Sequence, residues 1–299
     1  MRPTYLFKYR ADEEFTAKII VDREVWLATA AGLNDPLECQ TGTIPEDWKR
    51  RTIREREDAQ ITGVLFDFPF TPVERLFSLD RRLTKQWLKV FAKLPRDRKI
   101  RRMRELYRQH GLSISDPSEM FDTLEHQLAT VGIFSLSAND VQQLMWAHYA
   151  DSHRGLAFGF AVEDGSPLAN PEHLLEVTYD DEKPVFSSGH NREVRFIATD
   201  EGKIRSEDRI SFNDPVFRAS ISTKPKDWAY EQEWRYVHER SGAHTLPASL
   251  ASVTFGFRMP IERRSFYANL LRKHGFDVEL REVRPSASGG WETGPAEIR

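Results

Sequence analysis

Two acidic side chains, Glu231 and Glu233, are candidates for chemistry because they lie two residues apart in the chain. Side chains at i and i+2 point the same way only on extended backbone. If residues 231–235 begin a strand, Glu231, Glu233 and Arg235 share one face. One carboxylate could then activate a nucleophile while the other stabilises positive charge. The alternative is a structural ladder of acids and arginine that pins the strand, with Trp234 in the core.

Other polar residues could hold a charged ligand. Lys8 and Arg10 share a face of a predicted strand, and the planar fork of arginine suits a phosphate group. His148 and Tyr149 lie in a predicted helix over residues 142–153, where either could face a ligand. The alternative for His148 is a packed histidine beside an aromatic neighbour.

Metal binding has weaker support in the residue pattern. His148 and His153 do not have the i, i+4 spacing of a paired site on a helix, so we predict no zinc site. Asp35 and Glu38 could hold a hard metal ion, although Asn34 and Asp35 are also ordinary turn residues.

The composition excludes several classes of protein. Lys and Arg number 43 and Asp and Glu 46, so the net charge of −3 creates no global attraction to nucleic acid or anionic membrane. The single cysteine, Cys39, excludes a disulfide framework and a cysteine-rich zinc site. Phosphate-loop, dinucleotide-fingerprint, nucleophile-elbow and zinc-helix motifs are not found. Neither a run of about 18 apolar residues nor a signal peptide is found, so we expect a cytoplasmic protein without membrane contact.

The predicted elements mix strands and helices without regular alternation, which favours an α+β fold built on a single mixed or antiparallel sheet. We expect one domain over residues 1–284, with a helical insertion at about 45–130. Residues 285–299 are rich in Ser, Gly and Pro and are expected to form a flexible tail.

The insertion contains a strongly basic segment. Residues 81–110 hold twelve Lys or Arg against two acids, and Pro95 separates two predicted helices. The charged face could simply be solvated. Alternatively, the helices over Arg81–Arg108 could contact the phosphates of a nucleic acid.

Six segments together resemble the domain-of-unknown-function family 2971, and the resemblance covers most of residues 5–280. The block Trp-x-Tyr-Glu-x-Glu-Trp-Arg is its most specific part. The six segments are Leu6–Arg10, Glu24–Leu27, Leu33–Glu38, Met145–Asp151, Trp228–Arg235 and Phe255–Gly256.

The chain also resembles the ADP-ribosyltransferase fold. In that superfamily a strand bearing Arg or His precedes a helix and a strand, and Glu-x-Glu or Gln-x-Glu begins a later strand. Residues 5–29 and Glu231–Glu233 are similar to those pieces and occur in the right order. Ser135-Leu136-Ser137 partly matches the Ser-Thr-Ser strand that usually lies between them.

This second resemblance implies a nucleotide-dependent group transferase that uses NAD. Glu233 would stabilise an oxocarbenium-like transition state, and Glu231 would orient or deprotonate the acceptor. Arg10 would grip phosphate, and the base or ribose would lie near aromatic residues. The implied cofactor-binding residues are Tyr9, Arg10, His148 and Tyr149.

Two other functions remain open from the residues alone. One is a nucleic-acid binding or processing protein, in which Asp35, Glu38, Glu231 and Glu233 hold a divalent metal. The other is an interaction module without catalysis. The transferase hypothesis requires that the segments 8–10 and 231–233 line one cleft. We also expect Trp146, Trp228 and Trp234 to be largely buried.

Overall fold

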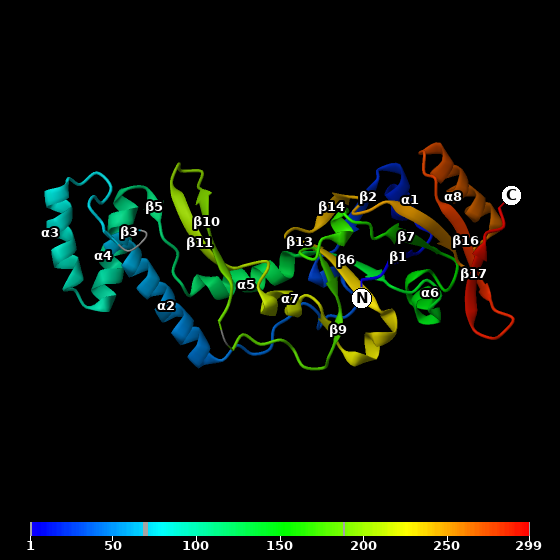
Figure 1. Cartoon of the computed structure of the whole chain (residues 1–299), viewed down its shortest axis with the longest axis horizontal. Coiled ribbons are helices and arrows are strands. Elements are labelled where there is room, and N and C mark those ends of the chain that lie inside the picture. Colours follow the sequence, from blue (N-terminus) through cyan, green and yellow to red (C-terminus); the bar gives the residue numbers. More distant parts are fainter. Residues whose placement is uncertain (1, 68–70, 188, 299) are drawn as a thin grey trace. The chain divides into compact units, whose positions relative to one another are not determined.

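A computed structural model describes residues 2–67, 71–187 and 189–298. The chain divides into two compact units, labelled by element in Figure 1. The first unit contains residues 1–40, 127–184 and 218–299, and the second contains residues 41–126 and 185–217. The helical insertion predicted at about 45–130 falls largely in the second unit, which also takes in residues 185–217.

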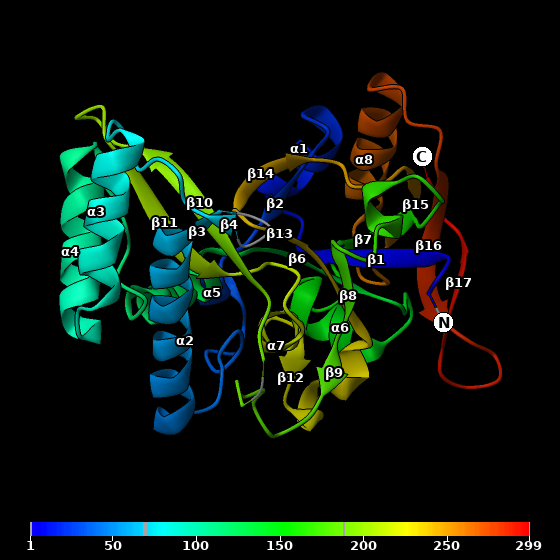
Figure 2. The ribbon, with the colours of Figure 1, turned by 60° about the vertical axis from the view of Figure 1, so that its left-hand side comes forward.

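The first unit is built on an eight-stranded sheet with the order β17-β16-β15-β7-β1-β6-β13-β8. Neighbouring strands are antiparallel except for β15 and β16, so the sheet is mixed and the fold is α+β, as predicted. The central strand β1 lies between β6 and β7 (Figure 2). The strands are β1 (Tyr5–Arg10), β6 (Gly132–Ser137), β7 (Leu156–Ala161), β8 (Leu174–Glu176), β13 (Glu233–His238), β15 (Leu250–Phe255), β16 (Glu279–Pro285) and β17 (Trp291–Pro295).

Short helices and strand pairs complete the first unit. Its main apolar cluster includes Leu6, Phe134, Phe158, Phe160 and Phe255 from the central strands. The remaining elements are α1 (Glu14–Val21), β2 (Glu24–Leu27), η1 (Ala30–Gly32), α6 (Gln143–Tyr149), η2 (Pro167–Ala169), β9 (Thr178–Tyr179), β12 (Thr223–Lys224), η3 (Lys226–Glu231), β14 (Gly242–Thr245) and α8 (Ile261–Lys273).

Helix α6 is shorter than the predicted helix over residues 142–153. It ends at Tyr149, and Asp151, Ser152 and His153 then adopt positive φ angles of 45°, 52° and 70°. This left-handed turn moves His153 off the helix, where its ring stacks on Trp291 with ring centroids 5.2 Å apart. Gly155 is required after the turn because a Cβ there would lie 2.1 Å from the carbonyl oxygen of Arg10.

The prediction that residues 285–299 form a flexible tail is wrong for residues 285–295. Residues 291–295 form β17, which pairs with β16 at the edge of the sheet. Gly289 and Gly290 have φ angles of 89° and 82°, so they close the hairpin between the two strands. The Ser-Gly composition therefore marks a turn, which the sequence pattern alone does not distinguish from a loose end.

The second unit combines long helices with a three-stranded sheet of order β10-β11-β5. Apolar side chains of α2, α3 and α4 form its core, including Val64, Phe91 and Met103. The buried ion pair of Arg56 with Asp208 joins α2 to β11. The elements are α2 (Glu46–Leu65), β3 (Phe66–Asp67), β4 (Thr71–Pro72), α3 (Arg81–Ala92), α4 (Arg96–Gln109), β5 (Leu112–Ser113), β10 (Arg192–Ala198) and β11 (Ile204–Ile210).

Two helices, α5 (Glu119–Thr130) and α7 (Pro215–Ser220), each contain residues of both units. Within the described part of the chain, no helix is both long enough and apolar enough to serve as a membrane span.

Candidate functional site

The first unit contains a cavity of about 950 Å³ beside strands β1, β6 and β13. Ligand pockets in proteins are typically about 300–1,000 Å³, so this cavity could hold a nucleotide-sized ligand. Lys8, Arg10, Glu231 and Glu233 all line it, which confirms that the two distant segments meet at one cleft. The sheet order explains the meeting, because β1 and β13 are both neighbours of β6 (Figure 2).

The start of β13 differs from the predicted continuous strand. Glu231 ends the 3₁₀-helix η3, and Gln232 has a left-handed conformation with φ 47° before the strand begins at Glu233. The strand alternation therefore applies to Glu233 and Arg235 but not to Glu231. The predicted ion pair of Glu231 with Arg235 is wrong, because Arg235 Nε donates instead to Glu233 Oε1 at 2.9 Å.

Three carboxylates surround the ammonium group of Lys224. Its Nζ lies 3.2 Å from Glu38 Oε1, 2.6 Å from Glu231 Oε2 and 3.2 Å from Glu233 Oε2. None of these four side chains is more than 5% exposed. We call this group the carboxylate cage; its members are Glu38, Glu231, Glu233 and the central Lys224.

Arg235 completes the cage from the sheet side. Its guanidinium binds both oxygens of Glu233, forms an ion pair with Glu38, and donates from Nη1 to the carbonyl of Ile221 at 2.9 Å. The side chain is fully buried. Three acids against two bases leave the group with one net negative charge at the wall of the cavity.

The two candidate catalytic acids have opposite pKa shifts. Burial alone would raise the pKa of Glu233, but the positive charges of Arg235 and Lys224 outweigh burial and lower it to about 2. Burial also raises the pKa of Glu231, and the charge of Lys224 does not fully reverse this effect. Glu233 is thus held ionised, whereas Glu231 is the better proton acceptor of the two.

Lys8 and Arg10 line the cavity, and neither forms an ion pair with a described carboxylate. Lys8 Nζ donates to the carbonyl of Ser135 at 2.9 Å and lies 4.8 Å from the centre of the Phe134 ring. Burial, and then the charge of Arg10, lower the pKa of Lys8 to about 8. Arg10 Nε is buried without a hydrogen-bond partner, and no described carboxylate forms an ion pair with this arginine. An anion in the cavity would satisfy it.

The other predicted cofactor-binding residues differ in their availability. Tyr149 lines the cavity, and its hydroxyl donates to Glu231 Oε1 at 2.5 Å. His148 also lines the cavity and is exposed. Tyr9 lines the cavity too, but its ring packs against Trp146 with ring centroids 5.0 Å apart, and its hydroxyl donates to the carbonyl of Asn139. The strand period of two places the Tyr9 side chain opposite Lys8 and Arg10, so its ring supports the sheet.

The three tryptophans predicted to be largely buried differ in their degree of burial, and none of them is exposed. Trp146 is completely buried, whereas Trp228 and Trp234 are half-buried. Trp228 lies beside the cage, with its ring centre 4.6 Å from Lys224 Nζ.

The metal alternative meets a specific obstacle in the cage. Lys224 Nζ occupies the position at which a divalent ion would contact Glu38, Glu231 and Glu233. Asp35 does not join these residues; it accepts a hydrogen bond from the backbone of Leu37 in a turn. No group of metal-ligating side chains suitable for an ion is found over residues 2–67, 71–187 and 189–298.

Sequence reasoning missed two features of the site. No motif singled out Lys224, which ends the two-residue strand β12 and is buried where β12 pairs with β9. Trp26 on β2 and Phe15 on α1 also line the cavity, and they are 69% and 63% exposed. The available signal was the alternation in Glu24-Val25-Trp26-Leu27, which places the Trp26 ring on the same face as Glu24 and opposite the buried Val25 and Leu27.

The fold and the site define an α+β protein with a deep, charged cavity next to a central strand. Residues 145–236 match the family described as "Protein of unknown function (DUF2971)", which confirms the resemblance to family 2971 over this segment. The matched residues include Tyr149, Lys224 and both candidate acids. Comparison with curated proteins and with solved structures finds no match.

Proposed function

We propose that the cavity binds a nucleotide, with NAD as the expected cofactor, and that the protein is an ADP-ribosyltransferase-like group transferase. The supporting observation is the placement of Arg10, the serines of β6 and Glu233 on three successive strands around one cavity. These are the three sequence pieces that resemble the ADP-ribosyltransferase fold. Their adjacency brings an anion-binding cation within one cavity of an ionised carboxylate.

Two serines of β6, which lies between β1 and β13, contact the two candidate acids. Ser135 lies opposite Arg235, and its side chain hydrogen-bonds Glu233. Ser137 lies opposite Glu233 and donates its hydroxyl to the backbone carbonyl of Glu231 at 2.7 Å. Both serines therefore position the acids, one through a side chain and the other through the backbone.

The cavity contains groups that suit the phosphates, the base and the ribose of a dinucleotide. Arg10 supplies a guanidinium group for phosphate oxygens, and its Nε has no hydrogen-bond partner among the described residues of the protein. Trp26 and Phe15 supply exposed aromatic faces on which a base can stack. The negative charge of the cage is available to the ribose that becomes cationic as nicotinamide leaves.

In the proposed reaction the bond between the nicotinamide nitrogen and the ribose carbon breaks, and its electron pair leaves with nicotinamide. The acceptor forms a new bond to that carbon and loses a proton to Glu231, whose raised pKa suits a base. Glu233 remains ionised throughout. With water as the acceptor, the products are ADP-ribose, nicotinamide and a proton.

Binding is tested by isothermal titration calorimetry of the full chain with NAD. We expect Arg10→Gln to weaken binding by about tenfold or more, the usual effect of losing a hydrogen bond to a charged group. Arg154→Gln is the matched control because the Arg154 side chain is 57% exposed and does not line the cavity. Equal NAD affinities of the two variants would show that Arg10 does not bind the phosphates of NAD.

Chemistry is tested separately by measuring nicotinamide release by chromatography. We expect Glu231→Gln to slow release or transfer while leaving NAD affinity nearly unchanged. Binding of NAD without any release by the wild-type protein, with or without protein and nucleic-acid acceptors, would contradict the transferase and leave a nucleotide-binding module.

A further inference from the structure

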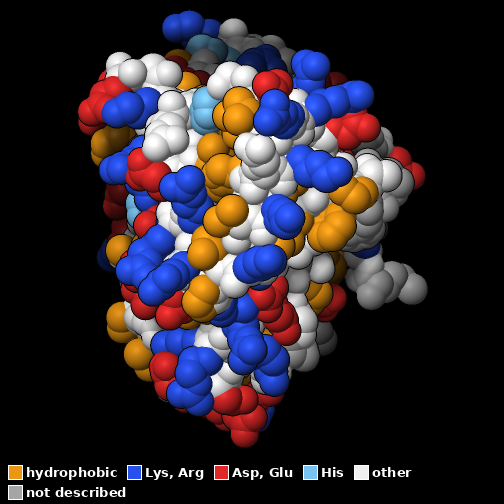
Figure 3. All heavy atoms as spheres, turned by 90° about the vertical axis from the view of Figure 1, so that its left-hand side faces the viewer, with side chains coloured by type: hydrophobic (Ala, Val, Ile, Leu, Met, Phe, Trp, Pro, Cys, Tyr) orange, Lys and Arg blue, Asp and Glu red, His pale blue; other side chains and the backbone are white. Residues whose placement is uncertain are grey.

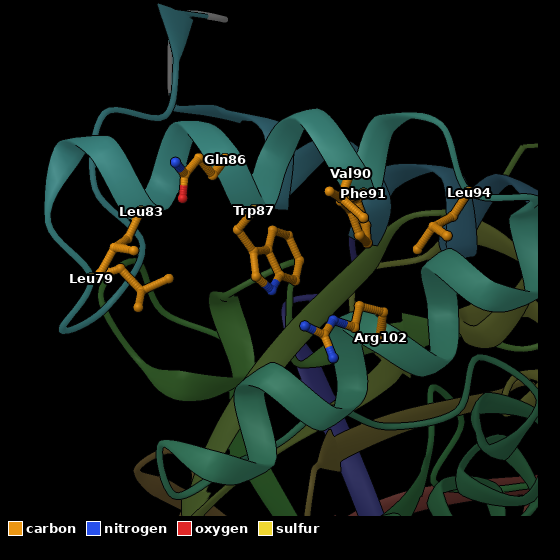
Figure 4. Close-up of a pocket in the computed structure, with 8 residues that line it drawn as sticks. All are labelled: Leu79, Leu83, Gln86, Trp87, Val90, Phe91, Leu94 and Arg102. Atoms are coloured by element: carbon orange, nitrogen blue, oxygen red, sulfur yellow. The ribbon is translucent and has the colours of Figure 1, made fainter.

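The second unit carries an apolar groove that is independent of the cavity described above. The groove has a volume of about 310 Å³ and lies between α3 and α4 (Figure 4). Side chains of α3 and its flanks line one wall, and Arg102 of α4 reaches toward them from the other side. The lining residues are Leu79, Leu83, Gln86, Trp87, Val90, Phe91, Leu94 and Arg102.

The apolar residues along the groove follow a helical stripe. Leu83, Trp87 and Val90 recur every three or four residues, so they lie along one side of α3, and Leu94 follows just after the helix ends. Leu83 is 48% exposed and Val90 is 64% exposed. A row of partly open aliphatic positions on a helix matches the recognition of a second amphipathic helix, whose side chains enter such a groove at i, i+3, i+4 and i+7.

The surroundings of the groove are strongly basic. Of the twelve Lys and Arg between residues 81 and 110, four form ion pairs with described residues: Arg81, Arg96, Arg104 and Arg108. The other eight form no ion pair with a described residue, and they are Arg82, Lys85, Lys89, Lys93, Arg98, Lys99, Arg101 and Arg102. Figure 3 shows Lys and Arg side chains around hydrophobic ones on this face.

We propose that this groove binds an acidic amphipathic helix of a partner protein. The partner's apolar side chains enter between α3 and Arg102, and its acidic residues meet the unpaired Lys and Arg on either side. Burial of apolar surface provides affinity. The charges accelerate encounter and select partners of opposite sign.

A nucleic acid fits the same surface less well. Phosphate contacts require the basic residues but make no use of Leu83 and Val90. The aromatic ring that could stack on a base, Trp87, is already stacked on Phe91 with ring centroids 4.7 Å apart, and the guanidinium of Arg102 lies 5.9 Å from its centre. The exposed part of the groove is therefore aliphatic, which suits a peptide side chain and not a base.

Fluorescence anisotropy with a labelled synthetic peptide tests the proposal. The probe is a helix with Leu at i, i+3, i+4 and i+7 and Glu at its other surface positions, and the reference is a shuffled peptide of equal composition. We expect the amphipathic peptide to bind at least tenfold more tightly than the shuffled one. Equal binding of the two peptides would mean that the groove makes no contribution, and it would overturn the proposal.

Substitutions locate the binding surface. Val90→Asp places a charge at an exposed groove position, and we expect it to weaken binding of the amphipathic peptide by at least fivefold. Val194→Asp on β10 is the matched control, since Val194 is 43% exposed and outside the groove. Circular dichroism checks that both variants remain folded. Equal effects of the two substitutions would overturn the proposal.

Competition with oligonucleotides separates the two classes of partner. A single-stranded and a duplex DNA of about the same length are titrated against the peptide complex and against the free protein. If DNA binds more tightly than the peptide, and Lys89→Glu weakens DNA binding while Val90→Asp does not, then the partner is a nucleic acid and the proposal of an acidic helix is overturned. Weak DNA binding, together with loss of peptide binding in both variants, supports the acidic helix.

Discussion

Removing the ammonium group at the centre of the carboxylate cage should destabilise the first unit strongly. Lys224→Met keeps a long unbranched side chain and leaves three buried carboxylates with Arg235 as their remaining ion-pair partner among the described residues. Glu231 loses the most, because its other side-chain contact is the Tyr149 hydroxyl. Losing one partner of a buried ion pair typically costs about 3–5 kcal/mol. For a unit of this size, such a loss lowers the melting temperature by roughly 6–20 °C.

The loss should depend on pH in a defined direction. The pKa of Glu231 is already raised by burial, and it rises further when Lys224 is removed. Between the unfolded pKa of about 4.3 and the folded pKa, the folded state then binds more protons than the unfolded state, so stability falls as pH rises. The deficit of Lys224→Met relative to wild type should therefore be smallest below about pH 4 and largest at neutral pH.

Urea denaturation followed by tryptophan fluorescence at several pH values measures both effects. Lys226→Met is the matched control because the Lys226 side chain is 62% exposed and pairs with Asp180 and Asp181 at the surface. We expect no measurable change in the unfolding midpoint of this control. A Lys224→Met variant as stable as wild type at neutral pH, or with an equal deficit at all pH values, would refute the account of the cage.

Three further outcomes follow from particular contacts. Gly155→Ala should destabilise the fold strongly because its Cβ would lie 2.1 Å from the carbonyl oxygen of Arg10. Gly63→Ala in helix α2 should stabilise the fold by up to about 1 kcal/mol, because the added Cβ would meet nothing within 4 Å beyond its own helix backbone and chain neighbours; thermal melts compare the two variants. Lys8 should titrate near pH 8 when its ¹³C-dimethylated amine is followed by NMR, with Lys8→Arg to assign the signal, and a value near that of ordinary lysines would contradict its burial beside Arg10. Cys39 is buried and its thiol pKa is raised by burial to about 11, so iodoacetamide should label it only after denaturation, as mass spectrometry would show.

The sequence could predict which residues line the cavity, because its basic and acidic side chains lie on two strands, β1 and β13, whose residue patterns are recognisable. Lys8 and Arg10 alternate with buried residues on β1, and Glu233 and Arg235 occupy alternate positions on β13, where both are themselves buried. Period-two alternation decides which side chains share a face. The same rule places the Tyr9 side chain on the face of β1 opposite Lys8 and Arg10, a consequence that the sequence interpretation did not apply.

The partners of the acids could not be predicted in the same way. Glu231 precedes β13, and the left-handed Gln232 between them carries no sequence signal such as Gly or Asn. Lys224 and Lys226 are both lysines flanking Pro225, yet one is 4% exposed and the other 62%. Only the pairing of β12 with β9 places Lys224 inside. Such tertiary contacts are not encoded in local residue spacing.

The cage also changes how the two acids must be tested. Substituting the candidate catalytic acid Glu233 with Gln would not isolate its chemistry, because Glu233 forms ion pairs with both Arg235 and Lys224. Its loss would leave two buried cations with fewer partners, so activity and stability would fall together. Glu231 is bound by Lys224 and by a neutral hydroxyl, and glutamine can keep hydrogen bonds to both. Glu231→Gln therefore separates chemistry from folding better than Glu233→Gln does.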